Sequence, residues 1–311
     1  DGSVYTWGLH TNGQLGDNTT TQRLLPVQVK DVAGTGTLAN ITKVSAGSSH
    51  TVALKNDGSV YAWGLNTNGQ IGDNTTTQRL LPVQAKDLTG NNNLAGVTAV
   101  STGSSYSVAV NSNGSVWGWG LNGNGQLGDG SVTQRNIPVT VKDALSTSNL
   151  MSNVKQITSG YFHTLVVKND GTVWAWGANG GGQLGDSTTT NRYLPVQVKD
   201  PTGLGYLNDV KNVSAGGYNS MALKNDGSVW AWGTNTSGQL GDNTTSQRNL
   251  PVQVKDPAGS SYLNGIIKIS LKAGGVVGAA IKTMVRYGRG VAMAMVISVM
   301  GQPPSAAYPF K

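Results

Sequence analysis

Residues 45–73 read SAGSSHTVALKNDGSVYAWGLNTNGQIGD, and this stretch decides the fold. It places two short apolar segments, 50–55 and 59–64, on either side of Asp57-Gly58. An Asp-Gly pair between such segments indicates a two-residue hairpin turn, in which both central residues need positive φ. Both faces of the second segment are largely apolar, which is expected for a strand packed between neighbouring sheets.

The same pattern recurs along the chain. The residue before the turn glycine lies at positions 1, 57, 113, 170 and 226, so successive copies are 56, 56, 57 and 56 residues apart. Such constant spacing indicates that every unit makes the same contacts with its neighbours and tolerates almost no insertion.

Each unit contains four predicted strands: a Pro-Val-Gln segment, a short segment ending in Ser-Ala-Gly, and the two strands of the hairpin. Four strands per unit, Gly-rich turns and one aromatic pair per unit are typical of β-propeller blades, so the predicted fold class is an all-β propeller. The sequence predicts complete blades at about 24–64, 80–120, 136–177 and 193–233. It leaves two arrangements open: an open arc of a larger ring, or a five-bladed ring closed by strand 1–8.

The repeat resembles that of the regulator of chromosome condensation family. The motif is S-A-G-x-x-H-x-x-A-L-K-x-D-G-x-V-x-x-W-G-x-N-x-x-G-Q-L-G-D, nearly intact at 45–73 and 214–242 with close copies at 101–129 and 158–186. The resemblance covers residues 1–282 and implies a propeller, typically of seven blades. On the ground of this resemblance we favour an open arc of a seven-bladed ring over the five-bladed ring. The polar Asn-Thr-Thr linkers and low charge resemble bacterial members of the family, and the chain reads as a fragment.

Residues 283–311 form an aberrant tail that does not match the repeat. Read one base back, codons across Met284/Val285, Met293/Ala294, Met295/Val296 and Met300/Gly301 must encode Gly, and permitted bases elsewhere spell a further copy. We therefore predict that the tail is an out-of-frame sixth repeat, produced by a frameshift.

Composition narrows the class of protein further. The chain has 44 Gly among 311 residues, no Cys, and a formal net charge of +7. Residues 1–267 carry 16 basic and 15 acidic side chains, so the excess basicity belongs to residues 268–311. Such a neutral repeat array gives little support for the basic face that nucleic-acid binding requires, so no nucleic-acid partner is expected. The apolar run 291–300 is too short to span a bilayer.

Few residues have the type and spacing that catalysis or metal binding requires. His50 and His163 share one repeat position, where other copies have Tyr106, Asn219 or Val277, and this variation favours a structural role. The third histidine, His10, has no metal-type or catalytic partner in its pattern. We predict no catalytic, cofactor-binding or metal-binding residue, and therefore no enzyme and no cofactor.

Two recurrent charged positions allow alternative interpretations. They form either a ring of ion pairs for a ligand, or Asp-capped loops in which Arg ties the loop to a neighbour; recurrence in every unit favours the second. The Asp positions are 17, 73, 129, 186 and 242, and the Arg positions are 23, 79, 135, 192 and 248.

We interpret the other recurrent features as structural. The Trp pairs, such as Trp174 with Trp176, are predicted to form the core between blades. The run Gly180–Gly182 lacks the Lys and the following helix of a phosphate loop. The variable positions on one propeller face are Asn12, Asn68, Asn124, Gly181 and Ser237.

Three functions follow as hypotheses. The first is a non-catalytic protein-interaction scaffold, monomeric, and extracellular or at the cell surface in preference to cytoplasmic. The second is a guanine-nucleotide exchange factor for a small GTPase, but the wedge-like insertion and basic arm that this activity implies in the family have no counterpart here. The third is a propeller-type inhibitor of a secreted enzyme.

Overall fold

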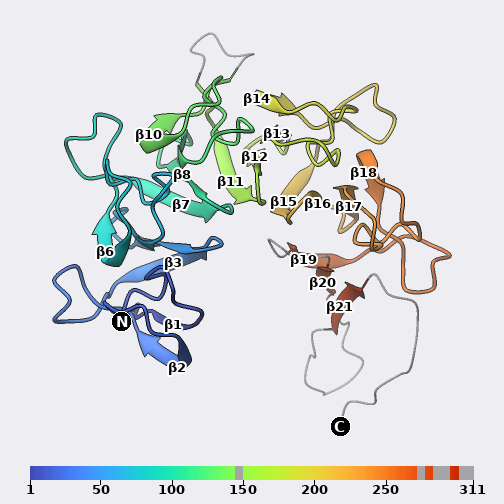
Figure 1. Cartoon of the computed structure of the whole chain (residues 1–311). Coiled ribbons are helices and arrows are strands. Elements are labelled where there is room, and N and C mark those ends of the chain that lie inside the picture. The colour runs from blue at the N-terminus through green and yellow to red at the C-terminus, as the bar shows by residue number, and fades with distance from the viewer. Residues whose placement is uncertain (144–149, 272–276, 283–294, 301–311) are drawn as a thin grey trace.

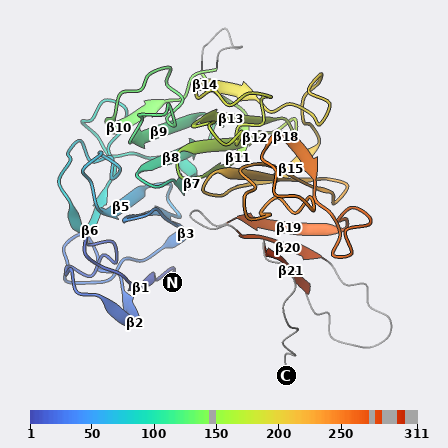
Figure 2. The ribbon, with the colours of Figure 1, turned by 45° about the vertical axis from the view of Figure 1, so that its right-hand side comes forward.

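The computed structural model describes residues 1–143, 150–271, 277–282 and 295–300. These residues form 21 strands in six antiparallel sheets and contain no helix. The sheets follow one another around an open arc (Figure 1), and the turned view shows them stacked face to face (Figure 2). The all-β propeller fold is therefore confirmed.

Each complete blade is built in chain order from the inside of the arc outward (Figure 1). The innermost strands are β3 (Ile41–Ala46), β7 (Val97–Thr102), β11 (Val154–Ser159), β15 (Val210–Ala215) and β19 (Ile266–Leu271). The second strands are β4 (His50–Lys55), β8 (Tyr106–Asn111), β12 (His163–Lys168), β16 (Asn219–Lys224) and β20 (Val277–Lys282). The third strands are β1 (Tyr5–Gly8), β5 (Val60–Gly64), β9 (Val116–Gly120), β13 (Val173–Gly177), β17 (Val229–Gly233) and β21 (Met295–Met300). The outermost strands are β2 (Arg23–Gln28), β6 (Arg79–Gln84), β10 (Arg135–Thr140), β14 (Arg192–Gln197) and β18 (Arg248–Gln253).

The predicted grouping of strands into blades was wrong. The Pro-Val-Gln strand closes the blade that precedes it: β6 pairs with β5 in the register Tyr61↔Gln84. The four complete blades are therefore β3–β6, β7–β10, β11–β14 and β15–β18. The long loop after the third strand leads to the outermost strand of the same blade, whereas the linker after the outermost strand crosses to the next blade. The sequence pattern does not show which of the two connections crosses.

The hairpin turn also differs from the prediction. The N–H of Gly58 donates to the carbonyl of Lys55 at 3.1 Å, and the N–H of Lys55 donates to Ser59 at 3.0 Å. Of the two predicted turn residues, only Gly58 has positive φ, at 81°. The connection is thus a three-residue loop, a turn followed by a left-handed glycine, and not a two-residue turn.

The two ends of the arc do not pair with each other among the described strands. Strand β1 pairs with β2, and β19, β20 and β21 form a three-stranded sheet, so the five-bladed closure by strand 1–8 was wrong. The seven-bladed ring stays a prediction. Strand β21 pairs with β20 where a third strand is expected. Tail residues 283–294 and 301–311 lie outside the described residues, and the frameshift stays a prediction.

Tryptophans of the third strands join neighbouring blades. Trp119 is fully buried, and its indole N–H donates to the carbonyl of Gln70, in the loop of the preceding unit, at 3.0 Å. A Cβ on Gly72 would lie 2.8 Å from this indole nitrogen, so the motif glycine makes room for the ring. Trp63, Trp176 and Trp232 donate to Gln14, Gln126 and Gln183 in the same way. The predicted role of the Trp positions in the core between blades is confirmed.

Candidate protein-interaction face

One end of the blades carries two kinds of connection, and together we call them the turn face. These are the short turns between first and second strands, such as 47–49, and the long loops after the third strands, such as 65–78. The N–H of Leu65 donates to the carbonyl of Ser49 at 2.8 Å, which holds the two connections side by side. The same bond recurs in the next three blades, so this face is built from equivalent parts.

The short turns of adjacent blades are linked by backbone hydrogen bonds. Ser48 N–H donates to Ser104, Ser104 N–H to Tyr161, and Tyr161 N–H to Gly217, at 3.1, 3.2 and 3.3 Å respectively. Only the backbone makes these bonds, so the side chains of the turns can vary without loss of the link. The turns therefore form a supported row, in which the hydroxyls of Ser48 and Ser104 also lie within hydrogen-bond distance at 3.0 Å.

Three aromatic side chains break the symmetry of this row, and we call them the aromatic turn cluster: Tyr161, Phe162 and Tyr218. Their ring centroids lie 5.7 to 6.3 Å apart, and the rings of Tyr161 and Tyr218 meet edge to face at 78°. Tyr218 is 46% exposed. The equivalent turns of the first two blades carry only serines: Ser48, Ser49, Ser104 and Ser105.

The loop beside the cluster contributes little side-chain bulk. The N–H of Ala178 donates to the carbonyl of Phe162 at 2.8 Å. This bond places Gly180–Gly182 next to the turn that carries Tyr161 and Phe162. Gly180 is exposed, and a Cβ there would meet nothing within 4 Å. Gly180 therefore leaves open space beside this turn, whereas a Cβ at Gly181 would clash with Thr234. The run holds no phosphate-loop geometry, because no helix follows it in the described part of the chain.

The paired histidines are structural. His50 is buried, and its Nε2 lies 3.0 Å from the hydroxyl of Ser107 on the next blade. His163 makes the same contact with Ser220. Burial lowers the pKa of His50 to about 4 and that of His163 to about 3, so both rings are neutral at physiological pH. Tyr106, in the same repeat position, likewise reaches the next blade.

The recurrent Asp and Arg residues belong to one loop network within each unit. Asp186 is 8% exposed and accepts hydrogen bonds from the amide of Asn179, from Thr188 and from Arg192. Asn179 also donates to Thr188 O and Thr190 O, while its own oxygen accepts the N–H of Leu184. The Asp-capped loop is thus the interpretation that the geometry bears out, with Arg tied to its own loop and not to a neighbour.

His10 takes the place of this asparagine in the first unit. Its Nδ1 accepts the N–H of Leu15 at 3.1 Å, and its Nε2 lies 2.7 Å from Asp17. Burial alone raises the pKa of Asp17, but hydrogen bonds from Thr19, His10 and Arg23 outweigh it and lower the pKa to about 2. His10 is therefore a structural substitute for asparagine.

The five variable positions all lie on the turn face. Their backbone N–H groups donate to the side chain of the glutamine two residues later, as Asn68 does to Gln70 at 2.9 Å. The set is Asn12, Asn68, Asn124, Gly181 and Ser237. All are partly exposed, and their use as ligand contacts stays a prediction. The aromatic turn cluster was not predicted from the sequence; comparing the residues before each His50-equivalent position shows that these turns differ, but not that the aromatic rings contact each other.

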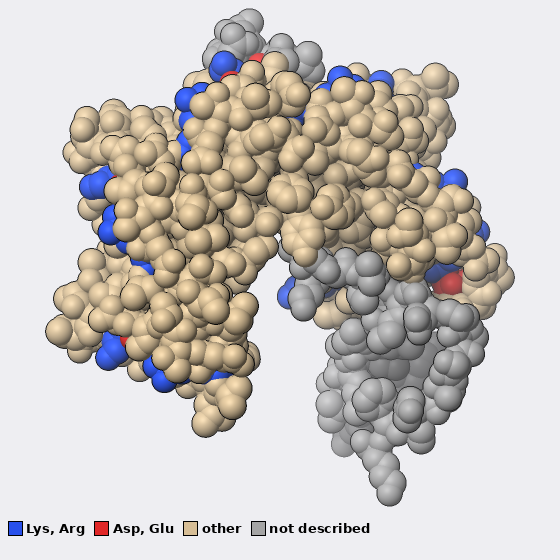
Figure 3. Space-filling model, in the orientation of Figure 1, with Lys and Arg blue, Asp and Glu red and all other residues tan. Residues whose placement is uncertain are grey.

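The described residues were also compared with the requirements of a metal site and of a membrane-spanning helix. Within them, no group of three or more His, Asp or Glu side chains is placed to hold a metal ion. No helix in the described part of the chain is long and apolar enough to cross a membrane. In the view of Figure 3, Lys and Arg lie mainly at the outer rim and most of the described surface is uncharged.

Comparison with known proteins decides the family. The family described as the RCC1-like domain matches residues 1–293. The chain belongs to this family. As an RCC1-like protein, it is 33% identical over 251 residues to the Ultraviolet-B receptor UVR8 of Arabidopsis thaliana, covering 81% of this chain and 53% of that protein. It is 30% identical over 257 residues to the human E3 ubiquitin-protein ligase HERC2, covering 82% of this chain and 5% of HERC2.

Solved structures share the fold. Human WBSCR16 matches with a TM-score of 0.70 and 23% identity, covering 88% of this chain and 66% of that one. Prp20p of Saccharomyces cerevisiae matches with a TM-score of 0.67 and 22% identity, covering 88% and 63%. The chain spans about half the length of UVR8. These relatives are eukaryotic, so the bacterial origin stays a prediction.

Proposed function

We propose that this RCC1-like chain is a non-catalytic scaffold that binds a protein partner through the aromatic turn cluster. The single observation that carries this proposal is the break in symmetry: Tyr161, Phe162 and Tyr218 replace serine or glycine in turns that are otherwise equivalent. Partly exposed aromatic side chains grouped on a surface are characteristic of the energetic centres of protein interfaces.

The contacts of the titratable side chains support the same proposal. The buried histidines and the Asp side chains of the loop networks are used in contacts within or between blades, for example His50 with Ser107 and Asp186 with Arg192. These groups are held by the fold and do not converge on a cleft as an acid–base pair would. A family member named as a receptor, UVR8, and the reported binding of Prp20p to Gsp1p and histones are compatible with a binding role.

The test compares capture of binding proteins by two variants. In the first, Tyr161→Ser, Phe162→Ser and Tyr218→Ser restore the residue type of the first two blades, where the same turns form normally. In the second, Tyr206→Ser and Tyr262→Ser remove tyrosines that are 49% and 48% exposed at the opposite end of the blades. We expect the first variant to lose the partner and the second to keep it.

The same proteins address the other two hypotheses. Acceleration of guanine-nucleotide release from a small GTPase would favour the exchange factor, and loss of activity of a secreted enzyme on binding would favour the inhibitor. Either result would replace the scaffold proposal, as would equal capture by both variants.

A further inference from the structure

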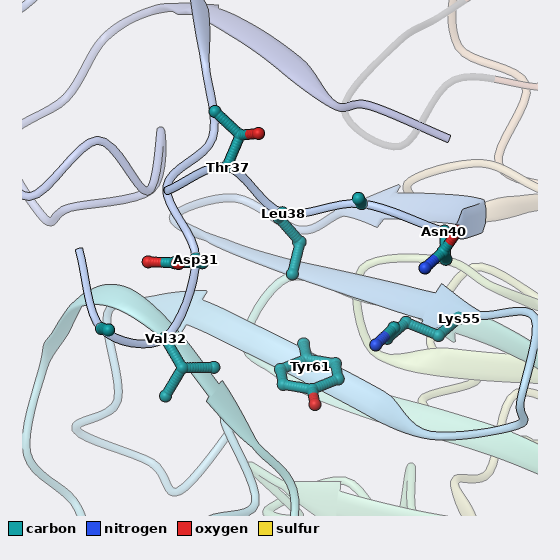
Figure 4. A pocket seen from close by; sticks show the side chains of 9 residues that line it. Asp31, Val32, Thr37, Leu38, Asn40, Lys55 and Tyr61 are labelled. Atoms are coloured by element: carbon teal, nitrogen blue, oxygen red, sulfur yellow. The ribbon is translucent and has the colours of Figure 1, made fainter. Parts of the chain in front are cut away.

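The end of the blades opposite the turn face carries a pocket. It is about 350 Å³ in volume and lies where the linker 31–40 meets the first complete blade (Figure 4). Its lining includes the side chains of Val32, Leu38, Lys55 and Tyr61 together with those of the polar residues Asp31, Thr37 and Asn40. The pocket shares no residue with the aromatic turn cluster, and its role is independent of the proposed function.

The pocket places one cation, Lys55, beside apolar side chains in a lining that also contains polar residues. In Figure 4 the ammonium group of Lys55 points into the pocket beside the ring of Tyr61, and its Nζ lies 5.6 Å from the ring centroid. The Lys55 side chain is only 23% exposed. Its distance to the carboxylate of Asp57 is 3.9 Å, too long for a close hydrogen-bonded ion pair. A second anion can therefore approach Lys55 from the pocket.

The third complete blade shows what occupies the equivalent place there. Lys168, the counterpart of Lys55, lies 3.0 Å from the carboxylate of Asp143, with side chains 15% and 5% exposed respectively. Nζ of Lys168 also lies 4.7 Å from the ring centroid of Trp174. This blade thus places a carboxylate against the lysine beside an aromatic ring.

The pocket lacks that internal carboxylate because of its own linker. Asp31, the counterpart of Asp143, accepts the N–H of Thr35 at 3.1 Å, and its carboxylate points away from Lys55 (Figure 4). In addition, Tyr61 stands where the next three blades have tryptophan. A smaller ring and a diverted carboxylate together leave space in front of the lysine.

We propose that this pocket binds a small monocarboxylate with an apolar body. The carboxylate contacts Nζ of Lys55, in the place that the Asp143 carboxylate takes beside Lys168. The apolar body packs against Val32, Leu38 and the ring of Tyr61. An ion pair in this partly buried setting is stronger than one in open water, because both charges are less solvated.

The test uses phenylacetate and its neutral analogue phenylacetamide, titrated into the whole chain and followed by NMR. We expect phenylacetate to shift signals of the pocket and to bind about tenfold more tightly than the amide. The variant Lys55→Asn, which introduces the residue found at the equivalent position 111, should abolish this preference. The matched variant Lys224→Asn, at a blade where Trp230 fills the aromatic position, should leave it unchanged.

Two further outcomes bear on the proposal. The variant Asp57→Asn removes the nearest competing anion and keeps the turn, since Asn113 occupies that position in the next blade, so it should tighten phenylacetate binding. Equal affinity for phenylacetate and phenylacetamide, binding that survives Lys55→Asn, or no shift of pocket signals at millimolar phenylacetate would each overturn the proposal.

Discussion

Nε2 of His50 lies 3.0 Å from the hydroxyl of Ser107 on the next blade. That hydroxyl donates its own proton to the carbonyl of Gln70 at 2.8 Å, so the proton shared with His50 comes from the imidazole. His50 is therefore neutral with its proton on Nε2, and its buried Nδ1 has no hydrogen-bond partner among the described residues. A neutral histidine joins the first complete blade to the second.

The first prediction concerns stability against acid. Burial lowers the pKa of His50 from 6.5 to about 4 and that of His163 from 6.5 to about 3. Between those values the unfolded chain binds more protons than the folded chain, so the free energy of unfolding falls as the pH drops below 6.5. We expect a loss of about 1 kcal/mol per pH unit for each histidine, measured by urea denaturation between pH 7 and 5.

The control for this effect comes from the chain itself. Asn219 occupies the same repeat position, so a His50→Asn, His163→Asn variant should fold and show a flatter pH dependence over this range. A profile as steep as that of the unaltered chain would show that other groups cause the acid sensitivity.

The second prediction concerns the tryptophans between blades. Trp119→Phe removes the indole donor to Gln70 O and leaves a small cavity, and we expect it to lower the free energy of unfolding by about 2 kcal/mol. Trp7 lies at the end of the arc and is 63% exposed. Trp7→Phe should therefore change stability little, and similar losses for both variants in denaturant titrations would contradict the packing described.

The third prediction separates the two interpretations of the Asp–Arg pairs. Asp186→Ala leaves the buried amide of Asn179 and the N–H of Thr188 without this acceptor, so it should cost about 3 kcal/mol of stability. Replacement of Arg192, whose side chain is 35% exposed, by Ala should lower the free energy of unfolding by about 1 kcal/mol. If the pairs instead formed a ligand surface, Arg192→Ala would abolish partner capture while leaving the denaturation midpoint unchanged.

Some elements of the fold were predicted correctly from the sequence and others were not. The strand β4 was predicted with its observed bounds, His50–Lys55, because a hairpin signal and a constant repeat fix it from both sides. The grouping into blades was wrong because β5 and β6 pair across a 14-residue loop. The alternation of apolar residues within each strand does not show which strand is its neighbour. The turn differed because Asp57 tolerates more than one backbone conformation, whereas Gly58 alone needs positive φ.

The candidate site was less visible than the fold. Repetition identifies residues that hold blades together, such as Trp119 and Asp186, because every blade needs them. The aromatic turn cluster appears only when Phe162 and Tyr218, 56 residues apart, are seen to contact each other across two blades. The proximity of Lys55 to an open pocket likewise depends on where Asp31 points, which residue identity does not determine.

The fourth prediction concerns residues 283–311. If they are an out-of-frame copy of the repeat, the coding DNA read one base back spells Asn-Asp-Gly at the next expected turn and a Trp-Gly pair soon after. Sequencing both strands of the gene over this segment checks the point. Codons that do not spell the repeat in that frame would establish the tail as a separate sequence.

The most direct test of the proposed function is site-specific crosslinking from the turn face. A photoreactive phenylalanine analogue placed at Tyr218, which is 46% exposed within the aromatic turn cluster, should give a discrete adduct with a protein partner. The same analogue at Tyr206, 49% exposed at the opposite end of the blades, should give none. An adduct from position 206 but not from 218 would contradict the account.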